Sequence, residues 1–367
     1  MSLIEETTQE VLRRCGELGF ALAGVAEARP TKYKQQYLAW IGAGKQGEMA
    51  YLARNIEQRL DPRTMLPGAK SIICVADRYG GEGSEARRHE GTKGREEQPS
   101  DETLKGKIAR YARGDDYHVV MKKRLHRLAD ELAQQFPDEV FRVCVDTAPV
   151  LEREHAQRAG LGAVGKHTLL IQEGVGSYVL LGEIITTLAL APTPSAEGAD
   201  PCGSCTRCID ACPTSAITPW SVDATRCISY LTIEHRGPIG EQFHEAMSDW
   251  IFGCDVCQEV CPHNQPTVRT AQVEAHDAYA PRREHFDLLT VLGWDEEARR
   301  AMFRTSPMKR AKLAMMKRNA LIAAGNVKGG ADHASLRGRV EALAEDETPG
   351  EMVRGTAAVV LKRWGQG

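Results

Sequence analysis

The sequence predicts a multidomain α+β protein built from three consecutive parts, residues 1–190, 191–275 and 276–367. In the first part, helical and strand-like patterns alternate, which favours an α/β domain. The second part contains eight of the eleven cysteines of the chain. From about residue 300 onward the third part contains short helical patterns and no strand-like run, which is typical of a small helical-repeat module.

The first part is expected to begin with a helix over residues 5–18, because Val11, Leu12, Cys15 and Leu18 recur at helical spacing and Gly19 suits its end. Further helical patterns cover 32–41 and 151–159. Apolar runs predict strands at 20–26, 71–76, 140–145, 168–172, 178–181 and 183–190.

Between the second and third of these strands the pattern changes twice. Residues 80–107 are almost devoid of apolar side chains and rich in Gly and mixed charge, so we expect a mobile loop there. A strong helical pattern follows, which Asp115 or Asp116 can cap and Pro137 ends. Its apolar stripe consists of Met121, Leu125, Leu128, Leu132 and Phe136.

The cysteine spacing in the second part predicts two [4Fe–4S] clusters. One run reads C-x2-C-x2-C-x3-C before Pro213, another reads C-x2-C-x3-C before Pro262, and Cys227 lies between them. Two such clusters need eight thiolates, and in bacterial ferredoxins the fourth cysteine of a run ligates the other cluster. The predicted ligands are Cys202, Cys205, Cys208 and Cys261 for cluster one, and Cys212, Cys227, Cys254 and Cys257 for cluster two. The alternative is a pair of structural zinc sites, which C-x2-C pairs also form.

Composition restricts the location and partners of the protein. The net charge is −3, no run of about 18 apolar residues suggests a membrane span, and the N-terminus is acidic and amphipathic, unlike a signal peptide. Because thiolate clusters need a reducing compartment, we expect a cytoplasmic protein that receives electrons from an external low-potential donor. We also expect a monomer. Cys15, Cys74 and Cys144 are expected to be buried core thiols.

The third part concentrates positive charge in one segment. Between Phe303 and Arg318 there is no acidic residue. The basic residues of this segment are Arg304, Lys309, Arg310, Lys312, Lys317 and Arg318. On a chain with a negative net charge, such a segment predicts contacts with nucleic-acid phosphates. The alternative is an ordinary solvated helix face.

Four segments, together with the cysteine runs, carry a family resemblance. They are GKIARYARGDDYH (106–118), VDTAPVLEREHAQRAGLGAVGKHTLLI (145–171), GSYVLLGEIIT (176–186) and KRNALIAAGN (317–326). Together they resemble epoxyqueuosine reductase, a cobalamin-dependent iron–sulfur enzyme family that completes queuosine synthesis in tRNA. The resemblance spans about residues 1–365, whereas the cysteine runs alone would be shared by many redox proteins.

The resemblance implies a role for each part. The first part would bind cobalamin, the second would be a ferredoxin-like module with two [4Fe–4S] clusters, and the third would be a HEAT-like helical module for tRNA. The reaction would reduce the epoxide of epoxyqueuosine at the wobble position to the alkene of queuosine. A D-x-H-x-x-G motif, whose histidine ligates cobalt, is absent, because the segment 116–121 lacks the Gly. The resemblance therefore implies base-off cobalamin without a protein histidine on cobalt.

By the same resemblance, Asp146 matches the family's proton donor. It follows the strand pattern at 140–145, and open α/β sheets usually place their sites at the carboxyl ends of strands. The reduction takes two electrons and two protons, so a positioned acid helps the C–O bond to break. To donate near neutral pH, the pKa of Asp146 must be raised, most simply by desolvation beside the corrin. The alternative role for Asp146 is to cap the helix at 151–159.

Other residues are candidates for contacts with cobalamin or substrate. They are Arg59, Tyr111, Asp116, Tyr117, His118, Lys166, His167, Ser177 and Glu183. Lys166, His167, Ser177 and Glu183 rest on the resemblance of their segments alone. Ordinary alternatives are a surface role for Arg59 and packing for the Tyr117–His118 pair.

Three other classes of protein account for less of the sequence. A ferredoxin-type electron carrier needs neither a 190-residue α/β part nor a basic helical tail. A corrinoid reductive dehalogenase usually carries a twin-arginine export signal, which this sequence lacks. A non-catalytic RNA-binding adaptor does not need iron–sulfur clusters.

Overall fold

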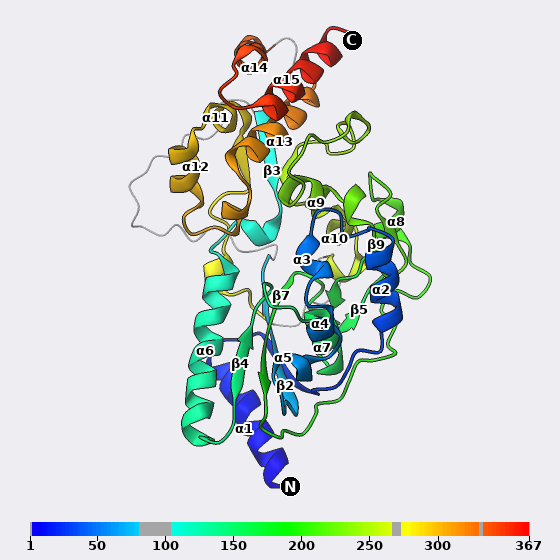
Figure 1. Ribbon diagram of the computed structural model, residues 1–367, viewed down its shortest axis with the longest axis vertical. Helices are drawn as coiled ribbons and strands as arrows, with labels where there is room; N and C mark the ends of the chain where they lie inside the picture. Colours follow the sequence, from blue (N-terminus) through cyan, green and yellow to red (C-terminus); the bar gives the residue numbers. More distant parts are fainter. Residues whose placement is uncertain (1, 81–103, 266–272, 330–332, 367) are drawn as a thin grey trace.

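The computed structural model describes residues 2–80, 104–265, 273–329 and 333–366. The molecule is elongated: the N-terminal helix lies at one end, the C-terminal helices lie at the other, and the cysteine-rich segment lies beside the middle (Figure 1). Most of the loop predicted at 80–107 falls outside the described residues. Its last residues are not a loop, because Lys105–Ile108 forms strand β3 and Leu104 is buried before it.

A four-stranded sheet forms the core of the first part, in the order β1–β2–β7–β4. Its strands are β1 (Leu22–Glu27), β2 (Ser71–Arg78), β7 (Val179–Thr186) and β4 (Phe141–Cys144). Every pair of neighbouring strands is antiparallel. The mixed α and β composition is therefore confirmed, but the sheet is not the parallel one that alternating helices and strands usually form.

Strand β7 corrects a prediction, because it joins two runs that were expected to be separate strands, 178–181 and 183–190. Gly182 lies in its middle, and a Cβ there would be 2.9 Å from Leu125 and 3.2 Å from Met121 of helix α6 (Tyr117–Gln135). The glycine therefore allows the helix to pack closely and does not end the strand. The strand predicted at 168–172 is present as the shorter β6 (Leu170–Ile171), which pairs with β5 (Ala163–Val164) in a hairpin.

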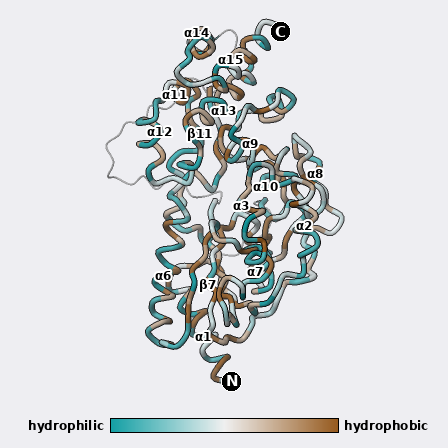
Figure 2. The backbone as a smooth tube through the Cα atoms, viewed as in Figure 1, coloured by the Kyte–Doolittle hydropathy of each residue, from teal (hydrophilic) through white to brown (hydrophobic). Residues whose placement is uncertain are grey.

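Helices cover both faces of the sheet. Helices α1 (Leu3–Glu17) and α6 lie on the face to which Ile73 and Ile184 point. Helix α7 (Glu152–Arg158) covers the other face, where Ile72 and Ile185 are buried. Cys15, Cys74 and Cys144 are buried in these cores, as predicted. Figure 2 shows hydrophobic stretches along the strands, which agrees with burial from both sides.

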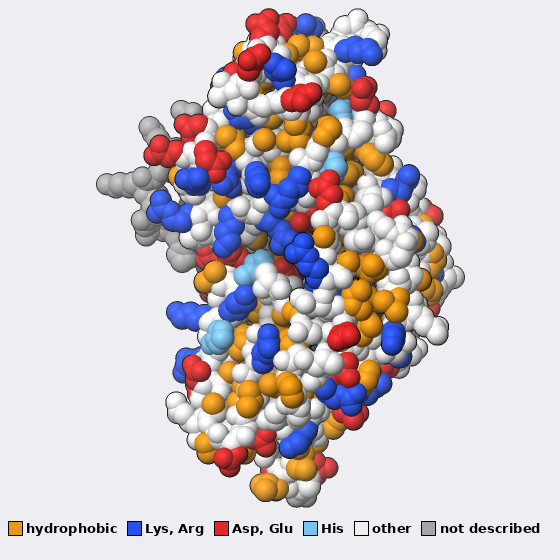
Figure 3. Space-filling view, in the orientation of Figure 1, with side chains coloured by type: hydrophobic (Ala, Val, Ile, Leu, Met, Phe, Trp, Pro, Cys, Tyr) orange, Lys and Arg blue, Asp and Glu red, His pale blue; other side chains and the backbone are white. Residues whose placement is uncertain are grey.

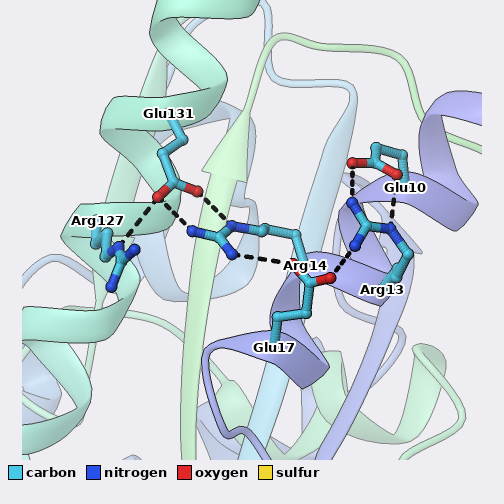
Figure 4. Close-up of polar contacts among 6 residues, drawn as sticks. All are labelled: Glu10, Arg13, Arg14, Glu17, Arg127 and Glu131. Atoms are coloured by element: carbon cyan, nitrogen blue, oxygen red, sulfur yellow. Dashed lines mark hydrogen bonds and ion pairs between the residues drawn. The ribbon is translucent and has the colours of Figure 1, made fainter.

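Helix α1 is also linked to α6 by ion pairs (Figure 4). Two nitrogens of Arg14 lie 2.6 Å from the two carboxylate oxygens of Glu131. Arg127 shares the same carboxylate at 3.1 Å. Partly exposed pairs of this kind contribute about 1 kcal/mol or less each, so the apolar contacts provide most of the stabilisation between the two helices.

An excursion between β1 and β2 carries four short helices. They are α2 (Lys34–Gly42), which matches the helix predicted at 32–41, α3 (Ala50–Ala53), α4 (Ile56–Leu60) and α5 (Pro62–Met65). This excursion contacts the cysteine-rich segment. The indole N–H of Trp40 donates to the carbonyl of Val222 at 2.7 Å, and the hydroxyl of Tyr230 accepts from the backbone N–H of Glu48 at 2.7 Å.

The cysteine-rich segment consists of short elements. They are α8 (Arg207–Asp210), β8 (Ile217–Thr218), β9 (Ser221–Val222), η3 (Ala224–Arg226), α9 (Ile228–Ile233), η4 (Glu241–Phe243), β10 (Trp250–Phe252), α10 (Val256–Glu259) and η5 (Pro262–Asn264). Strand β10 pairs with β3, and β3 pairs in turn with β11 (His285–Asp287). Each of the three predicted parts therefore contributes one strand to this second sheet.

The C-terminal part is helical. Its elements are η6 (Asp277–Tyr279), α11 (Leu288–Gly293), α12 (Glu296–Phe303), η7 (Pro307–Arg310), α13 (Leu313–Gly325), α14 (Ala334–Glu345) and α15 (Glu351–Trp364). No strand follows β11 among the described residues, as predicted. Within the described parts of the chain, no helix is long and apolar enough to cross a membrane.

Candidate active site

Three side chains from the sheet domain form a hydrogen-bonded chain that ends at Asp146. Asp116 caps the N-terminus of α6, and one of its carboxylate oxygens lies 2.7 Å from Nδ1 of His118. Nε2 of His118 lies 2.9 Å from the carboxylate of Asp146, just beyond β4. Tyr117 stacks on the His118 ring at 4.0 Å. The structure thus brings together four residues that the sequence placed in the candidate site.

The proton of this chain resides on the imidazole. Burial lowers the pKa of His118, but hydrogen bonds to Asp116 and Asp146 outweigh burial and raise it to about 9. Burial raises the pKa of Asp116, yet its bonds to His118 and Lys309 lower it to about 2. Both nitrogens of His118 therefore carry hydrogen at neutral pH, and each donates to a carboxylate.

In the protein alone the pKa of Asp146 is lowered, whereas the predicted rise concerned a carboxyl group desolvated beside the corrin. Burial is the largest single effect and raises this pKa, but the hydrogen bond and charge of His118, together with Arg310 and Tyr117, outweigh it, so the net pKa lies below its ordinary value. Almost half of the Asp146 side chain, 47%, is exposed, so water still solvates the carboxylate. A ligand bound next to Asp146 would displace this water and raise the pKa of the Asp146 carboxyl group.

The backbone of Asp146 is held by Glu152. Asp146 has a φ of 55°, in the left-handed region that non-glycine residues rarely adopt. Its N–H donates to Oε1 of Glu152 at 2.6 Å. The alternative role for Asp146, capping the helix at 151–159, is not what the structure shows, because Leu151 occupies the N-cap of α7 and the Asp146 carboxylate is directed to His118.

A cavity of 1640 Å³ opens beside Asp146. It is larger than the roughly 300–1,000 Å³ typical of pockets for small ligands. The excursion carrying α2 to α4, the segment after Asp146 and the cysteine-rich segment all contribute to its wall. The predicted residues that line it are Arg59, Tyr111, Asp146, His167, Arg310, Cys212, Cys227, Cys254 and Cys257.

Two buried polar atoms on the cavity wall suit a large polar ligand such as a corrinoid. Nε of Arg59 and Nε2 of His167 have no hydrogen-bond partner among the described residues, and both side chains are less than a tenth exposed. Burial lowers the pKa of His167 to about 4, so its ring is neutral. Because Nδ1 of His167 accepts the N–H of Leu169 at 3.1 Å, Nε2 carries the hydrogen. His167, which lines the cavity, therefore has at Nε2 a hydrogen-bond donor without a partner in the described parts of the chain, and no lone pair free to bind a metal.

Electrostatic interactions connect the cluster cysteines mainly within two sets. The nearest ionisable neighbours of Cys261 include Cys202, Cys208 and Cys205, which assist burial in raising its pKa to about 11. Cys254 has Cys227 and Cys212 as neighbours, and its pKa is raised to about 12, mainly by burial.

Cys257 lies near Cys254 and Cys227, and also near Cys208 of the other set. These neighbourhoods agree with the crossed ligand sets, which stay a prediction. Among the described residues that line the cavity are all four predicted ligands of cluster two and none of the predicted ligands of cluster one.

Three residues predicted to contact the corrin edge are not among the described residues that line the cavity. Nζ of Lys166 donates to the carbonyls of Gly203 and Cys205 at 2.7 and 3.0 Å, and so supports the first cysteine run. The hydroxyl of Ser177 accepts from Gln258 and Asn264, beside the second run. Glu183 belongs to β7 itself, and its buried carboxylate lies 2.9 Å from Nδ1 of His155 on α7.

The predicted tRNA-binding residues also differ in their surroundings. Nζ of Lys309 lies 2.5 Å from Asp116, Nε of Arg310 lies 2.5 Å from Glu234, and both cations are partly exposed. Lys312 is exposed and Lys317 is half-buried.

Arg318 is a correction, because it is fully buried and donates to the carbonyls of Leu231, His235 and Gly237. It joins α13 to the cysteine-rich segment and is not available to phosphates. Its positive charge in the sequence gave no sign of this burial.

Sequence reasoning missed Glu152, Glu234 and Tyr51. The only available signal for Glu152 was an acidic residue in the first turn of the helix that follows Asp146. Burial raises the pKa of Glu152 to about 8, so it is largely protonated at neutral pH. Tyr51 lies on α3, for which the sequence gave no prediction.

Two family descriptions match separate segments of the chain. The description "Epoxyqueuosine reductase QueG, DUF1730" matches residues 59–147, and "4Fe-4S double cluster binding domain" matches residues 201–264. The first match covers Arg59, His118 and Asp146. The second covers all eight cysteines of the predicted ligand sets. An iron–sulfur protein with two clusters is thereby supported over a pair of zinc sites.

Curated relatives are similar over most of their length. An epoxyqueuosine reductase from Cyclobacterium marinum is 39% identical over 326 residues, which cover 87% of this chain and 97% of the relative. An epoxyqueuosine reductase from Pseudomonas aeruginosa is 35% identical over 362 residues, which cover 95% of this chain and 92% of the relative.

Solved structures agree with these relatives. An epoxyqueuosine reductase with an epoxyqueuosine-modified tRNA-Tyr stem loop superposes with a TM-score of 0.85 at 28% identity, covering 98% of this chain and 90% of that one. An epoxyqueuosine reductase from Bacillus subtilis superposes with a TM-score of 0.83 at 27% identity, and the match covers 98% of this chain and 90% of that one. In that structure, the catalytic loop carrying an aspartate is swung out of the active site.

Proposed function

This chain belongs to the epoxyqueuosine reductase family, and we propose that it reduces the epoxide of epoxyqueuosine at the tRNA wobble position to the alkene of queuosine. The observation that carries this proposal is the shared cavity. Asp146, with protonated His118 behind it, lies on one part of the wall, and the four cysteines of the second predicted cluster lie on another. A substrate held there has access to both protons and electrons.

Two [4Fe–4S] clusters deliver the electrons in this proposal. The set containing Cys212 and Cys254 lines the cavity, so cluster two would pass electrons to the cofactor and substrate held there. The set containing Cys202 and Cys261 adjoins it through Cys208 and Cys257, so electrons enter from an external low-potential donor at cluster one.

Cobalamin is the cofactor that fits the cavity by size and by donors. When bound, it would supply the reducing centre at which the two electrons reach the epoxide carbon. Arg59 and His167 would donate hydrogen bonds to its polar groups, because their buried nitrogens lack partners. Tyr111, which is edge-on to Tyr117 at 6.1 Å, would form part of the apolar wall.

Asp146 and His118 share the task of protonating the oxygen as the C–O bond breaks. When cofactor and substrate fill the cavity, water leaves the Asp146 carboxylate and its pKa rises toward that of His118. The shared proton then moves from Nε2 of His118 to Asp146, and from Asp146 to the oxygen. Asp116 remains ionised and holds the imidazole in the required orientation.

The three predicted parts receive corresponding roles. Residues 1–190 form the cobalamin-binding catalytic domain, 191–275 form the ferredoxin-like two-cluster domain, and 276–367 form a HEAT-like helical domain that binds tRNA. The support for RNA binding is the exposed basic segment containing Arg304, Lys309, Arg310 and Lys312. Figure 3 shows Lys and Arg side chains gathered on the face near α12 and extending toward the middle of the molecule.

Cofactor loading and turnover test the proposal together. Protein reconstituted anaerobically should bind about eight irons and one corrinoid per chain, and should convert an epoxyqueuosine-modified tRNA stem loop to the queuosine form. Iron binding without corrinoid binding would contradict the cofactor assignment. A fully loaded protein that left the stem loop unchanged would contradict the function.

A further inference from the structure

Three residues far apart in the sequence meet beside Asp146. Tyr51 lies on α3, Glu234 follows α9, and Arg310 ends η7. The guanidinium carbon of Arg310 lies 5.4 Å from the centre of the Tyr51 ring, and its Nε lies 2.5 Å from Glu234. Tyr51 and Arg310 both line the cavity. Asp146 is close enough to both for its charge to affect the pKa of each.

The exposure of Tyr51 is not explained by the stability of the fold. The residue is 41% exposed, although aromatic rings normally contribute to stability by burial. Helix α3 has only four residues, and none of them is buried. The hydroxyl of Tyr37 donates to the carbonyl of Leu52 at 2.7 Å, so the backbone next to Tyr51 is fixed while its ring remains open. The ring is therefore presented on an anchored turn.

An open aromatic ring beside a guanidinium matches the chemistry of a nucleotide. Bases of single-stranded RNA stack on aromatic side chains, and arginine binds the phosphate. Arg310 belongs to the exposed basic segment, which also contains Arg304, Lys309 and Lys312. Figure 3 shows that Lys and Arg side chains continue from the region of α12 toward the middle of this face. An RNA backbone that followed these charges would reach Arg310 at the cavity.

Glu234 keeps Arg310 in place when RNA is absent. The side chain of Arg310 is 38% exposed and lines the cavity, so a phosphate can reach it, whereas the Glu234 side chain is only 14% exposed and is not among the described residues that line the cavity. Partly exposed ion pairs are weak, with net contributions of about 0–1 kcal/mol. Because a guanidinium has five N–H donors, Arg310 can bind a phosphate while its Nε keeps the contact with Glu234.

We propose that Tyr51 and Arg310 form the docking site for one nucleotide of the tRNA anticodon loop, with the Tyr51 ring stacked on the base and Arg310 bound to the phosphate. The site lies next to Asp146, so a nucleotide held there places the wobble position at the proton donor. This assignment rests on the proposed function, since it specifies how the same substrate is held.

The test compares Tyr51→Ala with Tyr51→Phe in the fully loaded enzyme. The probe is an epoxyqueuosine-modified tRNA stem loop, with its affinity measured by fluorescence anisotropy and corrinoid retention measured by absorbance. Loss of one stacked base corresponds to a weakening of about 5- to 150-fold for Tyr51→Ala. Tyr51→Phe keeps the ring and should bind within about twofold of the unmodified enzyme. Leu38→Ala is the matched control, because Leu38 is 39% exposed and lies outside the cavity lining.

Two results would overturn the docking site. One is unchanged stem-loop affinity in Tyr51→Ala. The other is loss of corrinoid together with loss of RNA affinity, which would make Tyr51 a cofactor contact. Failure of the unmodified, fully loaded enzyme to bind and convert the stem loop would instead refute the proposed function and this site with it.

Discussion

His118 places a protonated imidazole nitrogen 2.9 Å from the carboxylate of Asp146, the residue we propose as the proton donor. The sequence placed both residues in the candidate site but gave no reason for them to touch. Asp116 holds the opposite nitrogen of the ring at 2.7 Å, so the imidazole has a defined orientation and both its hydrogens are used. Proton delivery should therefore depend on the ionisation of His118 as well as on Asp146.

The first prediction concerns pH. Because the pKa of His118 is raised to about 9, the proton is present at neutral pH and is lost as the pH rises through about 9. The single-turnover rate with pre-reduced enzyme should fall across the same range, as a property of the coupled pair. The ion pairs of His118 also stabilise the fold most strongly at low pH. This stabilisation is fully present below the pKa of about 6.5 that His118 has in the unfolded chain, and it is lost as the pH rises toward 9. In His118→Gln the rate at pH 7 should be lower and nearly independent of pH. A variant with the wild-type pH profile would refute the role of His118.

The second prediction separates positioning from proton transfer at Glu152. Glu152→Gln retains the carbonyl oxygen that accepts the N–H of Asp146, so its single-turnover rate should stay within about threefold of normal. Glu152→Ala removes the acceptor and releases the strained backbone of Asp146, which should reduce the rate on the order of 10- to 100-fold. Cluster absorbance serves as the folding control. Equal losses in the two variants would indicate that Glu152 itself transfers a proton.

The third prediction tests the crossed ligand sets. Cys261→Ser should damage the same cluster as Cys205→Ser, because the structure groups Cys261 with the first run. Cys254→Ser should damage the other cluster. Electron paramagnetic resonance of the reduced proteins distinguishes the two. If Cys261→Ser and Cys254→Ser removed one and the same signal, the assignment would be wrong.

The fourth prediction compares a buried with an exposed cation of the basic segment. Arg318→Met leaves several buried carbonyls without a donor and should lower the free energy of unfolding by about 3 kcal/mol, measured by denaturant titration. Lys312→Met should change it by about 0.5 kcal/mol or less, because Lys312 is exposed. Lys312→Met should also reduce the salt dependence of tRNA binding by about one phosphate contact. An unchanged salt slope would place the phosphate contacts elsewhere.

Several elements were predictable because their signals are local. Asp116 at the start of an apolar helical stripe is a capping signal, and the structure uses it as one. The run 71–76 is continuously apolar and forms the buried strand β2. The cysteine spacing indicated clusters because the ligands of each run are close in sequence.

Other features depend on contacts between distant segments, which no local pattern contains. The split predicted within β7 failed because Gly182 makes room for α6 and does not interrupt the strand. Arg318 has the same charge as Lys312, yet only the packing of α13 against the cysteine-rich segment decides which one is buried. The lowered pKa of Asp146 follows from its contact with His118, 28 residues away in sequence.

The single-turnover rate of Asp146→Asn tests the central claim most directly. Enzyme loaded with clusters and corrinoid is reduced in advance, so that electron supply does not limit conversion of the epoxyqueuosine-modified stem loop. Asn is nearly isosteric and can accept the His118 hydrogen bond, so absorbance of the clusters and corrinoid should be unchanged. The account predicts a rate lower by about 10²- to 10⁴-fold, as expected for loss of a general acid. A rate near that of the unmodified enzyme would contradict the assignment of Asp146 as the proton donor.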